Sequence, residues 1–379
     1  MIYLDNAATS FPKPLCVSEE MNKCIKKYCG NPGRSSHKIS LASSQKIYET
    51  RLLLAEMFGT EPENVVFTYN TTYALNIAIK SFLKYSTNVL ISDIEHNSVI
   101  RPVAECARQK LCTYDIFSTA GSDDEIIENI KSKIRKNTSM IVCSHVSNVG
   151  SRKLPIKQIG ALCKEKGIFF IVDGAQSAGV QNIDMQDMAI DILCIPGHKS
   201  LYGPQGVGAM IFGQEKIGRT IFEGGIGINS LDTEMPDFLP ERYEGGTLAT
   251  PSIAGLCESL KWLKGIGVDK IRSYEENLYI TIKDRLLKNE KITVYQMNDY
   301  AGNTLMFNIN GMSAVSVASE LDKRAICVRS GLHCSPLAHK TLNTGDGGAV
   351  RIGIGVFNKT SDLYTLYDAL CDIIKSNNI

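Results

Sequence analysis

The sequence predicts an α/β fold, in which a large domain built on a mostly parallel sheet precedes a smaller α+β C-terminal domain. Apolar runs without polar alternation, at residues 168–172 and 190–195, are typical of parallel strands buried on both faces. Polar residues follow each run, and in open α/β sheets ligands bind at this carboxyl edge. Long helical patterns that lead into short strands indicate a separate α+β unit later in the chain. We predict an N-terminal arm that packs with the small domain (1–14), a large domain (15–250) and a small domain (251–379).

Composition excludes several classes of protein. With 379 residues, of which 44% are hydrophobic and 21% charged, the chain is long enough for one large core and a smaller domain. With a formal net charge of +1, the chain lacks the excess positive charge of proteins that bind nucleic acid or an anionic membrane, so we expect neither partner. No apolar stretch approaches the roughly 20 residues of a membrane helix. The chain opens with Ile2-Tyr3-Leu4-Asp5 instead of a basic leader, so we expect a cytoplasmic protein.

The 12 cysteines are scattered singly, without a CxxC pair or the Cys/His spacing of a zinc site. We therefore predict no metal site. Most of these thiols are expected to be reduced and buried, and Cys143, Cys163 and Cys194 lie inside apolar runs. Cys334 is the exception, because its neighbours are polar.

The first elements are an extended arm and a helix. Residues 2–4 and the small residues after them, including Ala7 and Ala8, have a form that packs against a ligand or a neighbouring domain. An amphipathic helix is expected over residues 41–58.

A strand at residues 64–69 leads through Thr71 and Thr72 into a helical pattern that reaches Phe82. Free backbone amides at a helix start, joined by two hydroxyls, form a phosphate site. An N-cap role for either threonine explains the local sequence equally well. Both interpretations stay open at this point.

Two further buried strands, at residues 89–92 and 140–144, end in polar segments that contain His96 and Asn148. The local sequence allows His96 to be a surface residue or to lie over a ring. We expect His145, which directly follows the second strand, to be structural.

An acid and an amine follow the two strands named first. Asp173 ends one apolar run, and Lys199 follows the other on a tight Gly-rich turn. Taken singly, Asp173 would cap the next helix and Lys199 would be a solvated loop residue. Together they suit pyridoxal phosphate, because the amine binds its aldehyde and the acid keeps its ring nitrogen protonated.

After residue 210, Gly-rich loops at 223–227 and 243–247 mark a long irregular crossing. A long helix is then expected over 252–265 and 271–287, followed by short strands at 304–308 and 326–328.

A second chemical centre lies near the C-terminus. Cys334 stands in a Gly-containing loop beside a histidine and near Arg329, neighbours that make a thiol more reactive. Without further support a solitary cysteine is usually inert. Arg351 leaves a strand among apolar residues, and its guanidinium suits a substrate carboxylate better than a surface salt bridge.

The motifs VDGAQSAG, at residues 172–179, and Gly197-His198-Lys199 resemble those of class V aminotransferase-fold enzymes, most closely the group II cysteine desulfurases and selenocysteine lyases. The segment Arg329-Ser330-Gly331-Leu332-His333-Cys334 matches their catalytic cysteine motif. The resemblance runs in the same order from Asp5 to Asn358. It implies the fold type I of pyridoxal-phosphate-dependent transferases, with a seven-stranded sheet in the large domain.

The resemblance also implies how pyridoxal phosphate would be held. The implied contacts are Lys199 for the aldehyde, Asp173 for the ring nitrogen, Gln176 for the phenolic oxygen, Asn148 for a cofactor oxygen, His96 stacked on the ring, and Thr71, Thr72 and His198 for the phosphate. Either Thr247 or Thr250 would complete the phosphate site across a homodimer.

The implied reaction is that of a cysteine desulfurase, with Lys199, Cys334 and His96 as catalytic residues. L-Cysteine would become L-alanine, and its sulfur would form a persulfide on Cys334 that passes to an acceptor protein or thiol, for example for iron–sulfur cluster assembly. The implied substrate contacts are Arg351, Arg329, Ala7 and Asn148. A selenocysteine lyase, a β-lyase that releases pyruvate, an epimerase and a non-enzymatic scaffold are the alternatives.

Overall fold

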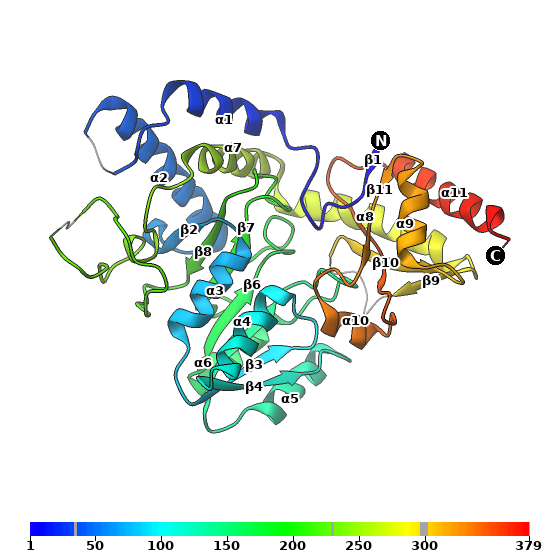
Figure 1. The fold of residues 1–379 in the computed structure, drawn as a ribbon, viewed down its shortest axis with the longest axis horizontal. Helices are drawn as coiled ribbons and strands as arrows, with labels where there is room; N and C mark the ends of the chain where they lie inside the picture. Colours follow the sequence, from blue (N-terminus) through cyan, green and yellow to red (C-terminus); the bar gives the residue numbers. More distant parts are fainter. Residues whose placement is uncertain (34–35, 229–230, 296–301, 379) are drawn as a thin grey trace.

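A seven-stranded sheet forms the centre of the larger unit in the computed structural model, which describes residues 1–33, 36–228, 231–295 and 302–378 (Figure 1). Its strand order is β2-β8-β7-β6-β5-β3-β4, and β8 is antiparallel to both of its neighbours whereas the other pairs are parallel. The predicted fold class is confirmed. The strands are β2 Val65–Thr68, β3 Thr87–Ser92, β4 Cys112–Phe117, β5 Thr138–Ser144, β6 Phe169–Asp173, β7 Ile192–Pro196 and β8 Gly208–Phe212.

The central strands are buried along nearly their whole length, which explains their apolar sequences. Strands β4 and β8 were not predicted from the sequence. All five residues of β8 are buried, and the strand follows the Gly-rich turn after Lys199. The turn therefore lies between two antiparallel strands at the carboxyl edge of the sheet.

Helices cover both faces of this sheet. On one face, apolar side chains of α2, α5 and α6 form a core with the strands. On the other face, α3 and α4 form a second core. The bounds are α2 Lys38–Phe58, α3 Thr71–Phe82, α4 Asn97–Arg108, α5 Asp123–Lys133 and α6 Ile156–Lys166. This three-layer arrangement leaves the carboxyl edge of the sheet as the place for a site.

Two helices, α7 Thr250–Ile266 and α8 Val268–Leu287, replace the long helix expected after residue 251, because Gly267 between them has a φ of 94°. Buried side chains of α7 join the core of the larger unit, where it packs on α1 Leu15–Lys27 and α2. In Figure 1, α8 (yellow) leads from α7 to the smaller unit. The domain boundary after residue 250 stays a prediction, and this packing favours placing α7 with the large domain.

The smaller unit holds a four-stranded antiparallel sheet of order β12-β13-β10-β9, packed against α8, α9 and α11. The N-terminal arm joins it: β1 pairs with β11, and Gly353 donates a backbone hydrogen bond of 2.6 Å to Leu4. No helix in the described residues is long and apolar enough to cross a bilayer. The remaining elements are β1 Ile2–Tyr3, β9 Ile292–Tyr295, β10 Thr304–Ile309, α9 Ala314–Asp322, β11 Ile326–Cys327, β12 Arg329–Gly331, α10 Pro336–Leu342, β13 Ala349–Gly353 and α11 Thr360–Ser376, with 3₁₀ turns at Pro62–Asn64 and Glu241–Tyr243.

Candidate active site

A pocket of about 430 Å³ lies at the carboxyl edge of the sheet, where β5, β6 and β7 end and α3 and α4 begin. It brings together every predicted cofactor residue except Thr247. The predicted residues that line it are Thr71, Thr72, His96, Asn148, Asp173, Gln176, His198 and Lys199. Their convergence follows from the parallel topology, since the ends of neighbouring parallel strands share one edge.

Asp173 and Lys199 face this pocket from adjacent strands. The Asp173 carboxylate is 4% exposed and accepts a hydrogen bond of 2.9 Å from the amide of Ala175. No ion pair within 4 Å of Asp173 is found among the described residues. Burial raises the pKa of Asp173. Desolvation within the pocket lowers the pKa of Lys199 to about 8, against the opposing charge of Asp173. Lys199 is therefore partly neutral near pH 8 and competent to accept a proton.

The start of α3 corrects the N-cap interpretation of the threonines. Asn70 is the N-cap, because its side-chain oxygen accepts a hydrogen bond of 3.0 Å from the amide of Tyr73. Thr72 instead shares a hydrogen bond of 2.7 Å with Ser98. The buried hydroxyl of Thr71 has no hydrogen-bond partner in the structure. The first turn of α3 therefore presents a hydroxyl and helix-terminal amides that suit an anion.

Two histidines on the pocket wall are neutral. Burial, with Lys199 nearby, lowers the pKa of both His96 and His198 to about 4. Nδ1 of His96 caps α4 by accepting a hydrogen bond of 3.1 Å from the amide of Ser98. Nδ1 of His198 is buried and has no hydrogen-bond partner in the structure. Neutral rings at these positions can donate or accept single hydrogen bonds to a ligand.

The N-terminal arm closes over the pocket. The buried residue Ala7 accepts a hydrogen bond of 3.0 Å from the side chain of Gln176. The hydroxyl of Ser10 donates a 2.9 Å bond to the carbonyl of Lys199, and Lys13 donates a 2.8 Å bond to the carbonyl of His198. The hydrogen bond with Gln176 holds Ala7 beside the pocket, as the sequence predicts. A contact between Ala7 and a substrate stays a prediction.

Arg351 is 1% exposed and lies on β13. Its Nη2 forms an ion pair of 2.8 Å with Asp5, and its Nη1 donates a bond of 3.3 Å to the carbonyl of Asn148. Its Nε has no hydrogen-bond partner in the structure. Asp5 was not among the predicted site residues, although its position two residues before Ala7 in the arm was a usable signal. Arg329 lies opposite Arg351 on β12.

The Cys334 loop is docked on the larger unit. Its thiol is exposed and lies 3.7 Å from Nη2 of Arg329. Asn148 holds the loop on both sides of the cysteine, because Nδ2 donates a 2.9 Å bond to the carbonyl of His333 and Oδ1 accepts a 2.7 Å bond from Ser335. One donor hydrogen and one lone pair of Asn148 remain for a ligand. Its predicted cofactor contact stays a prediction.

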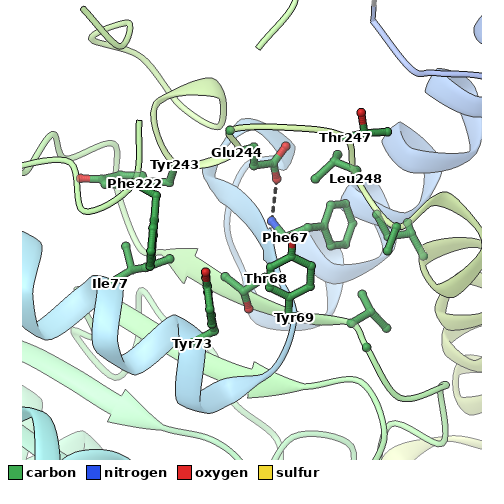
Figure 2. A pocket seen from close by; sticks show the side chains of 15 residues that line it. Phe67, Thr68, Tyr69, Tyr73, Ile77, Phe222, Tyr243, Glu244, Thr247 and Leu248 are labelled. Carbon is green, nitrogen blue, oxygen red and sulfur yellow. Dashed lines mark hydrogen bonds between the residues drawn. The ribbon is translucent and has the colours of Figure 1, made fainter. Parts of the chain in front are cut away.

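Thr247 lies outside the Lys199 pocket, on the wall of a second pocket of about 230 Å³ (Figure 2). Glu244 lines the same pocket, and Figure 2 shows the 2.6 Å hydrogen bond that its carboxylate accepts from the amide of Phe67. The carboxylate also pairs with Arg51 at 2.5 Å. Thr250 is buried at the start of α7. Neither threonine lines the Lys199 pocket of its own chain, so a role across a dimer stays a prediction.

The donor set of the pocket fits pyridoxal phosphate. An amine, a buried acid and an anion site with the unpartnered Thr71 hydroxyl lie in one cavity of suitable size. No cluster of three or more His, Cys, Asp or Glu side chains that could bind a metal is found in the part of the chain that the structure describes.

Comparison with known proteins identifies the family of the chain. The model of the family described as aminotransferase class-V matches residues 2–366. The chain is 31% identical to a probable cysteine desulfurase from Pyrococcus abyssi, over 99% of this chain and 95% of that protein. A probable cysteine desulfurase from Methanothermobacter thermautotrophicus is 29% identical, over 98% and 94% of the two chains.

Solved structures share the fold. An apo structure of a cysteine desulfurase from Thermococcus onnurineus superposes with a TM-score of 0.91 at 29% identity, covering 99% of this chain and 95% of that chain. A cysteine desulfurase from Escherichia coli, at 22% identity and a TM-score of 0.88 over 98% and 94% of the chains, supports the fold alone. The resemblance predicted from the motifs is thereby confirmed, and the chain belongs to the class-V aminotransferase family.

Proposed function

We propose that this protein is a pyridoxal-phosphate-dependent cysteine desulfurase, which converts L-cysteine to L-alanine and forms a persulfide on Cys334. One observation carries the proposal. Asn148 lines the Lys199 pocket and at the same time holds His333 and Ser335, the two neighbours of Cys334. A residue that lines a cavity suited to the cofactor thus also holds the loop that carries an exposed thiol. The names of the relatives support the same activity.

The pocket residues would hold the cofactor in the way the sequence predicts. Asp173 would bind the ring nitrogen, Lys199 the aldehyde, and Thr71 with the first amides of α3 the phosphate. When bound, pyridoxal phosphate supplies an aldehyde for the substrate's amino group and a ring that withdraws electrons from its α-carbon. His96 would lie against that ring.

The chain's own residues then carry the reaction. Arg351, helped by Arg329, would bind the carboxylate of L-cysteine. Lys199, with its lowered pKa, would remove the α-proton. The Cys334 thiolate would attack the substrate's sulfur, so that the carbon–sulfur bond breaks, the persulfide forms on Cys334 and the reprotonated product leaves as L-alanine. An acceptor protein or thiol would take the outer sulfur atom.

The alternatives have less support. A selenocysteine lyase and a β-lyase that releases pyruvate could use the same pocket, but the relatives are named cysteine desulfurases. A homodimer is supported by the position of the exposed Thr247 outside its own chain's Lys199 pocket. The cytoplasmic location and a role in iron–sulfur cluster assembly remain predictions.

Product analysis tests the proposal. The wild-type protein, loaded with pyridoxal phosphate and given L-cysteine and a reductant, is expected to form alanine and sulfide in equal amounts. Cys334→Ala should retain cofactor binding but lose activity to below about one hundredth of wild type, because the nucleophile is gone. Cys29→Ala, which removes another exposed thiol, is the matched control and should remain active. Pyruvate with ammonia as products, or full activity of Cys334→Ala, would contradict the desulfurase proposal.

A further inference from the structure

Three side chains form a hydrogen-bonded chain, here called the histidine chain, that begins at His333, the residue before Cys334. Nδ1 of His333 lies 3.0 Å from Nε2 of His339, and Nδ1 of His339 lies 2.7 Å from the hydroxyl of Thr344. All three residues are less than one tenth exposed. The two rings stack with their centroids 5.2 Å apart. His339 comes from α10, and Thr344 follows that helix, so the chain ties α10 and the residues after it to the cysteine loop.

Both histidines are neutral. Burial, followed by the nearby charge of Arg351, lowers the pKa of His333 to about 2 and that of His339 to about 4. A neutral imidazole has one donor and one acceptor nitrogen. Each ring therefore donates one hydrogen bond and accepts one, so all the hydrogen bonds of the chain run in the same direction.

The carbonyl of Arg329 fixes that direction. It can only accept, so Nε2 of His333, 3.4 Å away, must be the donor. Nδ1 of His333 then accepts from Nε2–H of His339. Nδ1 of His339 accepts from the hydroxyl of Thr344 at 2.7 Å, a much shorter contact than the 3.5 Å from that hydroxyl to the carbonyl of Gly345. Thr344 is therefore the last donor of the chain, and its hydroxyl satisfies the nitrogen of His339 that this direction leaves as an acceptor. A residue without a hydroxyl at this position would leave a buried ring nitrogen without a partner, which is costly.

The loop that these side chains support has an unusual backbone. His333 has a φ of 49° and Cys334 a φ of 58°, both in the left-handed region that residues with a Cβ rarely adopt. Such conformations persist only where several contacts with the surrounding structure hold them in place. Two contacts hold the loop backbone: Asn148 donates to the carbonyl of His333, and the amide of Asn97 donates a 2.7 Å bond to the carbonyl of Cys334. The histidine chain supplies a further contact, through the side chain of His333.

We propose that Thr344 and His339 are positioning residues for Cys334: by completing the hydrogen bonds of His333 they hold the cysteine loop in its left-handed conformation. This inference rests on the proposed function in so far as Cys334 is the sulfur acceptor. The motif Arg-x-Gly-x-His-Cys contains neither residue, and their role depends on the tertiary contacts alone.

The hydroxyl of Thr344 is the part to test, because matched variants exist. Thr344→Val keeps the shape and removes the donor, whereas Thr344→Ser keeps the donor. Thr341→Val makes the same change at an exposed threonine three residues away. Hydrogen–deuterium exchange of the backbone amides in residues 330–335 reports loop opening without any need for activity. Steady-state alanine formation from L-cysteine is measured on the same cofactor-loaded proteins.

Thr344→Val is expected to raise amide exchange in the loop by about tenfold and to lower kcat by about tenfold. KM for L-cysteine should stay within about twofold, because the loop does not bind the carboxylate. Thr344→Ser and Thr341→Val should behave as wild type. Equal behaviour of Thr344→Val and Thr344→Ser overturns the proposal, as does an equal effect of Thr341→Val. A wild-type protein that forms no alanine overturns the proposed function instead, and the exchange comparison still tests the histidine chain.

Discussion

The contact between Asp5 and Arg351 bears on the proposed binding of a substrate carboxylate by Arg351. The guanidinium of Arg351 is buried, and its ion-pair partner is a carboxylate from the N-terminal arm. The carboxylate of an amino-acid substrate carries the same charge and geometry. Asp5 and the substrate would therefore compete for Arg351, unless the arm moves when the substrate binds.

Asp5→Asn is expected to lower KM for L-cysteine several-fold, since the competing charge is removed. The same change should lower the free energy of unfolding by about 2 kcal/mol, because the buried Arg351 loses its counter-charge. Steady-state kinetics and urea denaturation measure the two effects. Asp346→Asn, at an exposed position before β13, is the control. A higher KM in Asp5→Asn would mean that Asp5 orients the arginine for the substrate.

At the scale of an element, the start of α3 divides two tasks between neighbouring residues. Asn70 caps the helix and so contributes to its stability. The buried hydroxyl of Thr71 makes no hydrogen bond in the protein, so it costs free energy unless a ligand satisfies it. Stability and ligand binding are therefore separable at this helix terminus.

Thr71→Val is expected to weaken binding of pyridoxal phosphate by about tenfold, because one hydrogen bond to the phosphate is lost. The melting temperature of the cofactor-free protein should stay unchanged or rise. Asn70→Ala should instead lower the free energy of unfolding by about 1 kcal/mol through loss of the cap. Absorbance titration with the cofactor and thermal melts of the cofactor-free variants measure both. Unchanged cofactor affinity in Thr71→Val would exclude this hydroxyl from the phosphate site.

At the scale of the whole molecule, the buried carboxyl group of Glu275 links the turn that follows Lys199 to the smaller unit. Glu275 on α8 is fully buried and accepts hydrogen bonds from the hydroxyl of Tyr202, at 3.0 Å, and from Asn303, at 3.2 Å. The amide of Tyr202 donates to the carbonyl of Lys199 at 2.8 Å. Burial, opposed by the two hydrogen bonds, raises the pKa of Glu275 to about 8.

This raised pKa predicts a dependence of stability on pH. The folded protein keeps the Glu275 proton up to about pH 8, whereas the unfolded chain loses it near the ordinary value of 4.5. The contribution of the neutral Glu275 carboxyl to the free energy of unfolding is fully present below about pH 4.5 and is lost as the pH rises through about 8. Glu275→Gln is always neutral, so between pH 5 and 9 its stability relative to wild type should rise by on the order of 4 kcal/mol.

Thermal melts of wild type and Glu275→Gln at several pH values check this expectation. Glu276→Gln changes the next residue on the same helix, which is partly exposed. Its stability relative to wild type should not rise between pH 5 and 9. Parallel curves for wild type and Glu275→Gln would mean that Glu275 is ionised in the folded protein.

Local patterns in the sequence were sufficient for the fold class and for the convergence of the pocket. Apolar runs predict buried parallel strands, and parallel strands place the residues after them at one edge, so Asp173 and Lys199 could be grouped without coordinates. His96 was grouped with them through the family resemblance. The motif around Cys334 marked the second centre. Strand β4, which is less fully buried, and β8, which follows a Gly-rich turn, were not predicted because their patterns are short and give no distinct period.

Only the tertiary structure determined which partner each polar side chain takes. Asn70 rather than a threonine caps α3, because only its carboxamide reaches the amide of Tyr73. Arg351 pairs with a residue 346 positions away, and Asn148, in the loop after β5, holds His333 of the Cys334 loop 185 positions later in the chain. Hydrophobic period is a local property of the chain, whereas a buried hydrogen bond depends on which groups the completed packing brings within about 3 Å of each other. The sequence by itself determined the class and the chemical groups of the site, and the fold determined their pairing.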